Sequence, residues 1–129
     1  MILLLDSSVL IGHLQGDPGC ITFLADHMVA GTDLRASAVT WAELLAGEGL
    51  DAAGEGVVFD LLQLFTPAAV TPAVGTAAGR LLRAHGRPRG LRMADALIAA
   101  TALELDCPVA TLDRRHLGVV PGLVTVEPS

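Results

Sequence analysis

Short segments rich in β-forming residues alternate with helical segments along this sequence. The alternation is typical of a parallel sheet whose strands are joined by crossover helices, and it predicts an α/β fold. We expect strands near Ile2–Leu5, Asp33–Ser37, Ala69–Thr71, Val109–Leu112 and Leu123–Val126. We expect helices near Val9–Gln15, Pro18–Val29, Trp41–Gly47, Glu55–Phe65, Ala73–Ala84 and Met93–Leu105, and loops at Gly16–Pro18, Gly47–Gly56 and His85–Gly90. The 129 residues contain no internal repeat or linker, so we expect one domain over residues 1–129.

The apolar content is high for a chain of this size. Hydrophobic residues make up 52% of it, yet no apolar run approaches the roughly 20 residues of a membrane span. We therefore expect no membrane association, and an apolar surplus that covers a subunit or partner interface. The residues before Asp6 include no basic side chain and are too few for a secretory signal, which favours a cytoplasmic protein. Cys20 and Cys107 lack metal-site spacing and are expected to be buried thiols of a reducing compartment.

Charge is distributed unevenly along the chain. Residues 1–79 carry a net charge of −8, residues 80–129 carry +2, and lysine is absent. The overall net charge of −6 argues against a freestanding duplex-binding protein. Five arginines lie close together in the sequence: Arg80, Arg83, Arg87, Arg89 and Arg92. For the cluster taken alone, a solvated helix end is favoured over a phosphate-binding patch.

Four acidic residues stand out by their positions: Asp6, Glu43, Asp95 and Asp113. Asp6 and Asp113 each follow an expected strand, and each has a structural explanation as a helix cap. Glu43 has a strong structural explanation too, because Thr40 to Glu43 matches a capping box. Asp95 is harder to explain in this way. It lies in an almost wholly apolar helix, where an unpaired buried carboxylate costs several kcal/mol, so it needs a cation or a proton.

Topology predicts that these acids converge. Ligands of open α/β sheets bind beyond the carboxyl ends of the strands, which is where Asp6 and Asp113 lie if the first and fourth strands are neighbours. Asp95 begins the helix that leads into the fourth strand, and Glu43 lies on the helix after the second strand, so both can point into the same crevice. Four clustered carboxylates raise one another's pKa unless divalent cations neutralise them. Oxygen ligands alone select Mg²⁺, or Mn²⁺, over zinc and copper.

These residues lie in four motifs, "LDSSVLI", "WAELLAG", "MADALIAATAL" and "VATLDRRHL". Their order and spacing resemble those of PIN-domain ribonucleases, in particular the VapC-type toxins of bacterial toxin-antitoxin pairs. The resemblance implies a three-layer sandwich with a five-stranded parallel sheet in the order 3-2-1-4-5 and helices on both faces. It further implies an acidic metal site made of Asp6, Glu43, Asp95 and Asp113, with Ser8 and Thr111 as nearby polar helpers. A cognate antitoxin, an RNA substrate and a homodimer are implied as well. Leu117 departs from the pattern, because many relatives have an aromatic residue there.

The function expected from this pattern is an Mg²⁺-dependent endoribonuclease that uses an activated water rather than a covalent nucleophile. Phosphates would be held by arginines beside the acids: Arg87, Arg89 and Arg92, with Arg114 and Arg115 as a further source of positive charge. No histidine forms a recognisable Ser-His-Asp pattern, so the histidines are expected to serve packing or the surface.

Two other functions stay open. A phosphotransfer protein with an acidic pocket, such as a receiver domain or a haloacid-dehalogenase-like phosphatase, would also place Asp6 after the first strand. Ser8 in place of a second acid, and the absence of lysine, argue against it. A catalytically silent PIN-like scaffold that binds a partner would require a broken acidic set, and this set is complete.

Overall fold

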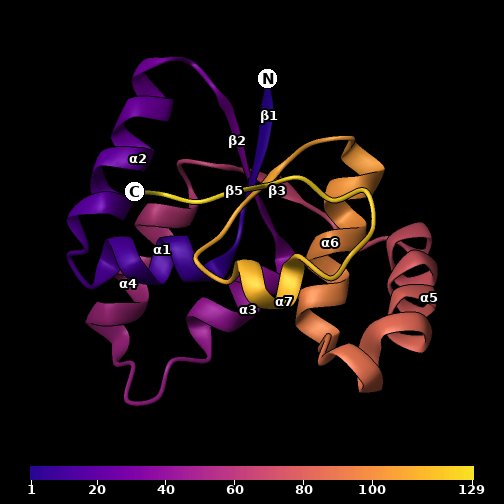
Figure 1. Ribbon diagram of the computed structural model, residues 1–129. Coiled ribbons are helices and arrows are strands. Elements are labelled where there is room, and N and C mark those ends of the chain that lie inside the picture. Colours follow the sequence, from indigo (N-terminus) through magenta and orange to yellow (C-terminus); the bar gives the residue numbers. More distant parts are fainter.

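Five parallel strands form one sheet at the centre of the protein, in a computed structural model that describes residues 1–129 (Figure 1). The strands are β1 (Ile2–Leu5), β2 (Asp33–Ser37), β3 (Thr66–Ala68), β4 (Val109–Ala110) and β5 (Thr125–Val126). Their order across the sheet is β3-β2-β1-β4-β5, and every neighbouring pair is parallel. The expected strand order is confirmed, and it places β1 at the centre of the sheet beside β4.

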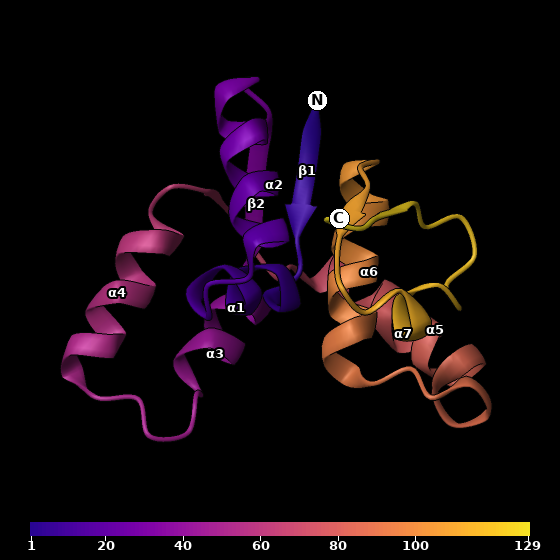
Figure 2. The ribbon, with the colours of Figure 1, turned by 60° about the vertical axis from the view of Figure 1, so that its left-hand side comes forward.

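Helices cover both faces of the sheet. They are α1 (Ser7–Leu14), α2 (Pro18–Val29), α3 (Ala38–Leu45), α4 (Ala52–Leu62), α5 (Pro72–Arg89), α6 (Met93–Leu105) and α7 (Arg114–Leu117). Figure 2 shows α1 to α4 on one side of β1 and β2, and α5 to α7 on the other. The expected three-layer sandwich is therefore confirmed. None of these helices is long and apolar enough to cross a membrane.

The leucines of β1 explain why the sheet is covered on both faces. Successive side chains of a strand point to opposite faces. Leu3 and Leu5 are buried in the core beneath α1 to α4, and Leu4 is buried in the core beneath α5 and α6. A strand that is apolar at consecutive positions is typical of a parallel sheet with helices on both sides.

Several element boundaries differ from the sequence expectation. Three helices, α1, α3 and α4, begin at least two residues earlier than expected. The side chains of Ser37 and Asp51 cap α3 and α4, whereas Asp6 precedes α1 without a capping bond. The expected loop at residues 85–90 is wrong over most of its length, since α5 continues to Arg89 despite Pro88. Gly90 ends the helix instead, with a φ of 75° that glycine adopts without steric cost.

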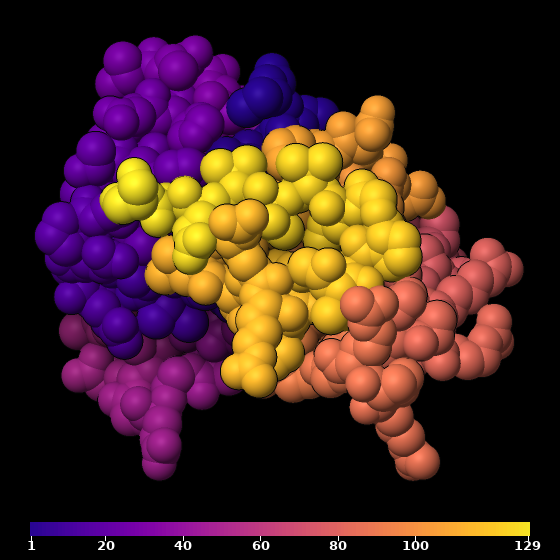
Figure 3. All heavy atoms as spheres, viewed as in Figure 1, coloured from indigo at the N-terminus to yellow at the C-terminus, as the bar shows by residue number.

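The strands β3, β4 and β5 also differ from their expected bounds. β3 lies three residues earlier than expected and includes Pro67, which is tolerated because β3 is an edge strand. β4 and β5 are shorter than expected, with two residues each. The C-terminal segment, yellow in Figure 3, crosses this face of the molecule toward the indigo N-terminal helices. A Cβ added at Gly19 would lie 2.5 Å from the carbonyl oxygen of Ser129, so the end of the chain packs closely on α2.

Candidate active site

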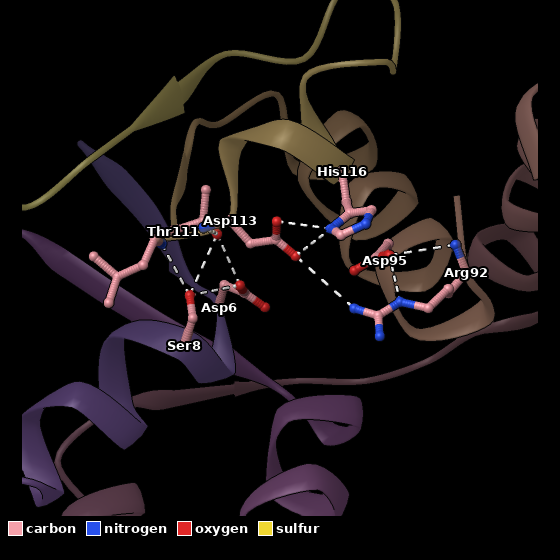
Figure 4. Close-up of polar contacts among 8 residues, drawn as sticks. Asp6, Ser8, Arg92, Asp95, Thr111, Asp113 and His116 are labelled. Carbon is pink, nitrogen blue, oxygen red and sulfur yellow. Dashed lines mark hydrogen bonds and ion pairs between the residues drawn. The ribbon is translucent and has the colours of Figure 1, made fainter. Parts of the chain in front are cut away.

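The four predicted acids approach one edge of the sheet from different elements. Asp6 follows β1, Asp113 follows β4, Glu43 lies on α3, and Asp95 lies in the first turn of α6. β1 and β4 are neighbours, and the Asp6 amide donates a hydrogen bond of 2.9 Å to the Ala110 carbonyl. The topology argument is thus confirmed for Asp6 and Asp113. Figure 4 shows these two residues with Asp95 and their polar partners.

Asp6 is buried and is held by two hydroxyl groups. Its Oδ2 accepts hydrogen bonds of 2.8 Å from Ser8 Oγ and 2.8 Å from Thr111 Oγ1 (Figure 4). Asp6 occupies the cap position of α1, but its side chain makes no capping bond, so the cap explanation is wrong for its carboxylate. Oδ1 has no hydrogen-bond partner in the protein and is not sealed from solvent. Asp6 therefore presents one fixed oxygen and one free oxygen.

The same two hydroxyls also hold the chain that leads to Asp113. Ser8 Oγ accepts a hydrogen bond of 2.9 Å from the Leu112 amide, and Thr111 Oγ1 accepts one of 2.8 Å from the Asp113 amide. Each hydroxyl has a single proton, which it donates to Asp6, and uses a lone pair for the amide. Ser8 and Thr111 thereby fix Asp6 relative to the backbone of Asp113.

Glu43 does not belong to the predicted capping box. α3 begins at Ala38, and the Ser37 hydroxyl caps it by accepting from the Val39 amide at 3.0 Å. Thr40 lies inside the helix, and its hydroxyl donates to the Leu5 carbonyl at 3.4 Å. Tertiary contact and an earlier cap therefore replace the local pattern, and the Glu43 carboxyl is left for another role.

The electrostatic environment of Glu43 indicates that the acids influence one another. The residue as a whole is exposed, but partial burial of its carboxyl group, then the charge of Asp6 and that of Asp95, raise its pKa. The Ser7 hydroxyl and Arg92 oppose this rise in the pKa. Glu43 therefore shares the electrostatic field of the other acids, as the sequence predicted.

Asp95 has the cation that its burial requires. Its side chain is only 12% exposed. Its Oδ2 accepts hydrogen bonds of 3.3 Å from the Arg92 amide and 3.3 Å from Arg92 Nε. The amide contact is the returning half of a capping box, which the structure places at Arg92 to Asp95 rather than at Thr40 to Glu43. The structure therefore places beside Asp95 a cation, one of the two partners expected for this carboxylate.

Asp113 is held by a histidine that the sequence analysis assigned to packing or the surface. His116 Nδ1 lies 2.8 Å from both carboxylate oxygens of Asp113, and Arg92 Nη2 lies 3.9 Å from Oδ2 (Figure 4). Asp113 makes no side-chain capping bond to α7. The signal that could have identified His116 is its spacing of three residues from Asp113, which puts both side chains on one side of a short helix.

The five arginines predicted to bind RNA are placed differently from one another. Only Arg92 contacts the acids. Arg114 pairs with Glu127 at 3.5 Å, and Arg115 is exposed beside it. Arg87 and Arg89 are exposed in the last turn of α5 and form no ion pair. The five arginines therefore have different surroundings, and their contact with RNA stays a prediction.

The donor chemistry of the site fits a hard divalent cation. Asp6, Glu43, Asp95 and Asp113 supply only carboxylate oxygens, which suit Mg²⁺ or Mn²⁺. Asp6 keeps a free oxygen, and Asp95 and Asp113 already share one positive charge, that of Arg92. No three Asp, Glu, His or Cys side chains lie close enough to one another to hold an ion as they stand. Side chains would therefore have to move before three of them ligated one ion, whereas one or two carboxylates with bound water suffice for Mg²⁺.

Comparison with known proteins gives one consistent family. The PIN domain profile matches residues 3–121. Ribonuclease VapC19 of Mycobacterium tuberculosis is 33% identical over 127 residues, which cover 93% of this chain and 95% of the relative. Two solved structures share the fold. A DNA-bound VapBC from Salmonella typhimurium has a TM-score of 0.82 at 19% identity, covering 100% of this chain and 99% of that one. A toxin-antitoxin complex from Klebsiella pneumoniae has a TM-score of 0.80 at 21% identity, covering 98% of each chain.

Proposed function

This chain belongs to the PIN-domain family, and on that premise we propose that it is a VapC-type ribonuclease, the toxin of a type II toxin-antitoxin pair. Its relative VapC19 is named a ribonuclease and aligns along almost the whole chain. The observation that carries the proposal is the pair of hydrogen bonds that fixes the Asp6 carboxylate. Two hydroxyls hold this carboxylate in place beside Asp113, at the sheet edge that Asp95 and Glu43 also reach.

The four acids would form the metal site of this nuclease. Asp6, Glu43, Asp95 and Asp113 would hold Mg²⁺, or Mn²⁺ in its place. When bound, the ion would supply Lewis acidity for an attacking water and positive charge for the transferring phosphate. No covalent nucleophile is needed, and none of the serines near the site pairs with a histidine.

The neighbouring residues position these acids. Ser8 and Thr111 donate hydrogen bonds to Asp6 Oδ2 and fix it, so the free Oδ1 keeps one orientation. His116 holds both oxygens of Asp113. Hydrogen bonds of this kind, from groups behind the metal ligands, determine the orientation and the basicity of the ligands.

Arginine side chains near the acids would bind the phosphates of the RNA. Phosphates repel a cluster of carboxylates, so the substrate needs cations beside it. Arg87 and Arg89 end α5 without ion-pair partners, Arg92 contacts two of the acids, and Arg115 is exposed two residues after Asp113. We expect these residues, with Arg114 once it leaves Glu127, to contact the RNA backbone.

An antitoxin and a second copy of the chain are the proposed protein partners. Large apolar side chains remain exposed, among them Met28, Val29, Val57 and Leu64. Where such side chains join into one contiguous patch, they would form the surface that a protein partner covers. For a toxin that cleaves RNA of its own cell, the expected location is the cytoplasm.

RNA cleavage by matched variants tests the proposed function. The wild type should cleave single-stranded RNA with Mg²⁺, stop with a chelator and recover when Mg²⁺ is restored. Asp6→Asn and Asp95→Asn should each lose at least about 100-fold, since even an outer partner of a metal ligand is worth about 10- to 100-fold. Asp26→Asn, an exposed control on α2, should retain activity. Undiminished cleavage by folded Asp6→Asn and Asp95→Asn would refute the assignment.

A further inference from the structure

Arg92 occupies a position between two of the proposed metal ligands. Its Nε lies 3.3 Å from Asp95 Oδ2, and its Nη2 lies 3.9 Å from Asp113 Oδ2. Figure 4 shows the guanidinium reaching from the start of α6 toward both carboxylates. No other arginine forms an ion pair with the four acids. One side chain of the protein thus supplies positive charge where the metal would supply it.

The guanidinium is held weakly enough to leave. The Arg92 side chain is 70% exposed, and ion pairs of exposed side chains contribute little to stability. The geometry is also not the bidentate fork that makes strong arginine–carboxylate pairs. The backbone amide of Arg92 separately donates a hydrogen bond of 3.3 Å to Asp95 Oδ2, and this contact does not depend on the Arg92 side chain. Asp95 can therefore keep its position in α6 while the guanidinium moves away.

We propose that Arg92 is a built-in counter-cation of the acidic site, which competes with the divalent ion for Asp95 and Asp113 and is released toward RNA phosphate when that ion binds. The inference rests on the proposed function and adds a metal-dependent step to it. In the metal-free protein the guanidinium offsets part of the negative charge of Asp95 and Asp113. In the metal-bound protein two cations would repel each other, and an RNA phosphate would be the available anion.

The proposal predicts effects of opposite sign on metal and on RNA. Removing the charge of Arg92 removes a competitor, so the divalent ion should bind more tightly. The same change removes a phosphate contact, so RNA should bind more weakly. A purely structural role predicts something else, because loss of a residue that merely positions Asp95 and Asp113 would weaken metal binding.

Isothermal titration with Mg²⁺ separates these roles, using Arg92→Gln, Arg92→Lys and the control Arg83→Gln. Arg83 is exposed on α5 and forms no ion pair, so its variant makes the same change in net charge away from the acids. We expect Arg92→Gln to bind Mg²⁺ about three- to tenfold more tightly, the range that two exposed ion pairs imply. Arg92→Lys should bind Mg²⁺ with an affinity between those of the wild type and Arg92→Gln, and Arg83→Gln should match the wild type.

Cleavage kinetics supply the second measurement. Arg92→Gln should raise KM for single-stranded RNA at saturating Mg²⁺ by about three- to tenfold, the effect of one phosphate contact, with a smaller change in kcat. Equal or weaker Mg²⁺ binding by Arg92→Gln would overturn the competition, and an unchanged KM would overturn the release toward RNA. Absence of Mg²⁺ binding by the wild type would overturn the proposed function together with this inference.

Discussion

Replacement of Thr111 by valine removes one hydroxyl that links two of the acids while keeping the shape of the side chain. Thr111 is fully buried. Its hydroxyl donates to Asp6 Oδ2 at 2.8 Å and accepts from the Asp113 amide at 2.8 Å. Thr111→Val would leave the Asp113 amide without this acceptor and would leave Asp6 with Ser8 alone.

The expected cost follows from these two bonds. A hydrogen bond to a charged group contributes about 1.5–3 kcal/mol, and an unsatisfied buried backbone amide costs about 1–3 kcal/mol. Asp113 is only partly buried, with a side chain 30% exposed, so access of water to its amide reduces the second figure. We therefore expect Thr111→Val to lower the free energy of unfolding by about 2–4 kcal/mol. Because Asp6 and Asp113 lose a common anchor, RNA cleavage should fall as well, by about 10- to 100-fold.

Urea unfolding measures this cost, with Thr101→Val as the matched control. Thr101 is also buried, but its hydroxyl donates only to the Leu97 carbonyl of its own helix, at 2.7 Å. Its valine variant should therefore change the free energy of unfolding by less than about 1 kcal/mol. Equal destabilisation by the two variants, with cleavage unchanged in Thr111→Val, would refute the role given to this hydroxyl.

Three further outcomes are expected. In chemical denaturation, Gly12→Ala should lower the free energy of unfolding by about 1–3 kcal/mol, because a Cβ there would lie 2.6 Å from Cys20 Sγ. Gly56 faces open space on α4, so Gly56→Ala should raise the free energy of unfolding by up to about 1 kcal/mol. Burial raises the pKa of the Cys20 thiol to about 11, so Cys20 should resist thiol reagents at pH 8 in the native protein and react once it is unfolded; fast labelling of native Cys107→Ser would contradict this. Burial and the charge of Asp6 raise the pKa of Glu43 above its usual 4.5, so the ionised carboxylate destabilises the folded protein. With chelator present, the Tm of the wild type should therefore fall relative to that of Glu43→Gln as the pH rises through and above 4.5. A Tm difference that does not depend on pH would contradict this electrostatic effect.

Most of the fold could be predicted because its signals are local. The run of leucines in β1 and the alternation of strands and helices predict a parallel sheet covered on both faces, and the bounds of β1, β2, α2 and α6 match the expectation. The ends of α5 and β3 could not be predicted in this way. Pro88 marks a loop in most sequences, yet the helix stops two residues later, at a glycine.

The positions of site residues could be predicted where they depend on strand order. They could not be predicted where a side chain has several possible hydrogen-bond partners. Asp6 and Asp113 follow adjacent strands, so their proximity depends only on strand order. The capping box that was the structural alternative for Glu43 does not form, because Ser37, three residues before Thr40, caps the helix. The pairing of His116 with Asp113, and of Arg92 with two acids at once, depends on rotamers and on distant segments that the sequence does not specify.

Locating Mn²⁺ in a crystal of the protein by anomalous scattering tests the central claim most directly, namely that the four acids form one metal site. The account predicts an anomalous peak about 2.0–2.2 Å from an Asp6 oxygen and from an Asp95 or Asp113 oxygen, with the Arg92 guanidinium moved away from the acids. The peak should disappear in Asp6→Asn. A peak elsewhere on the protein, or none at this edge of the sheet at saturating Mn²⁺, would contradict the account.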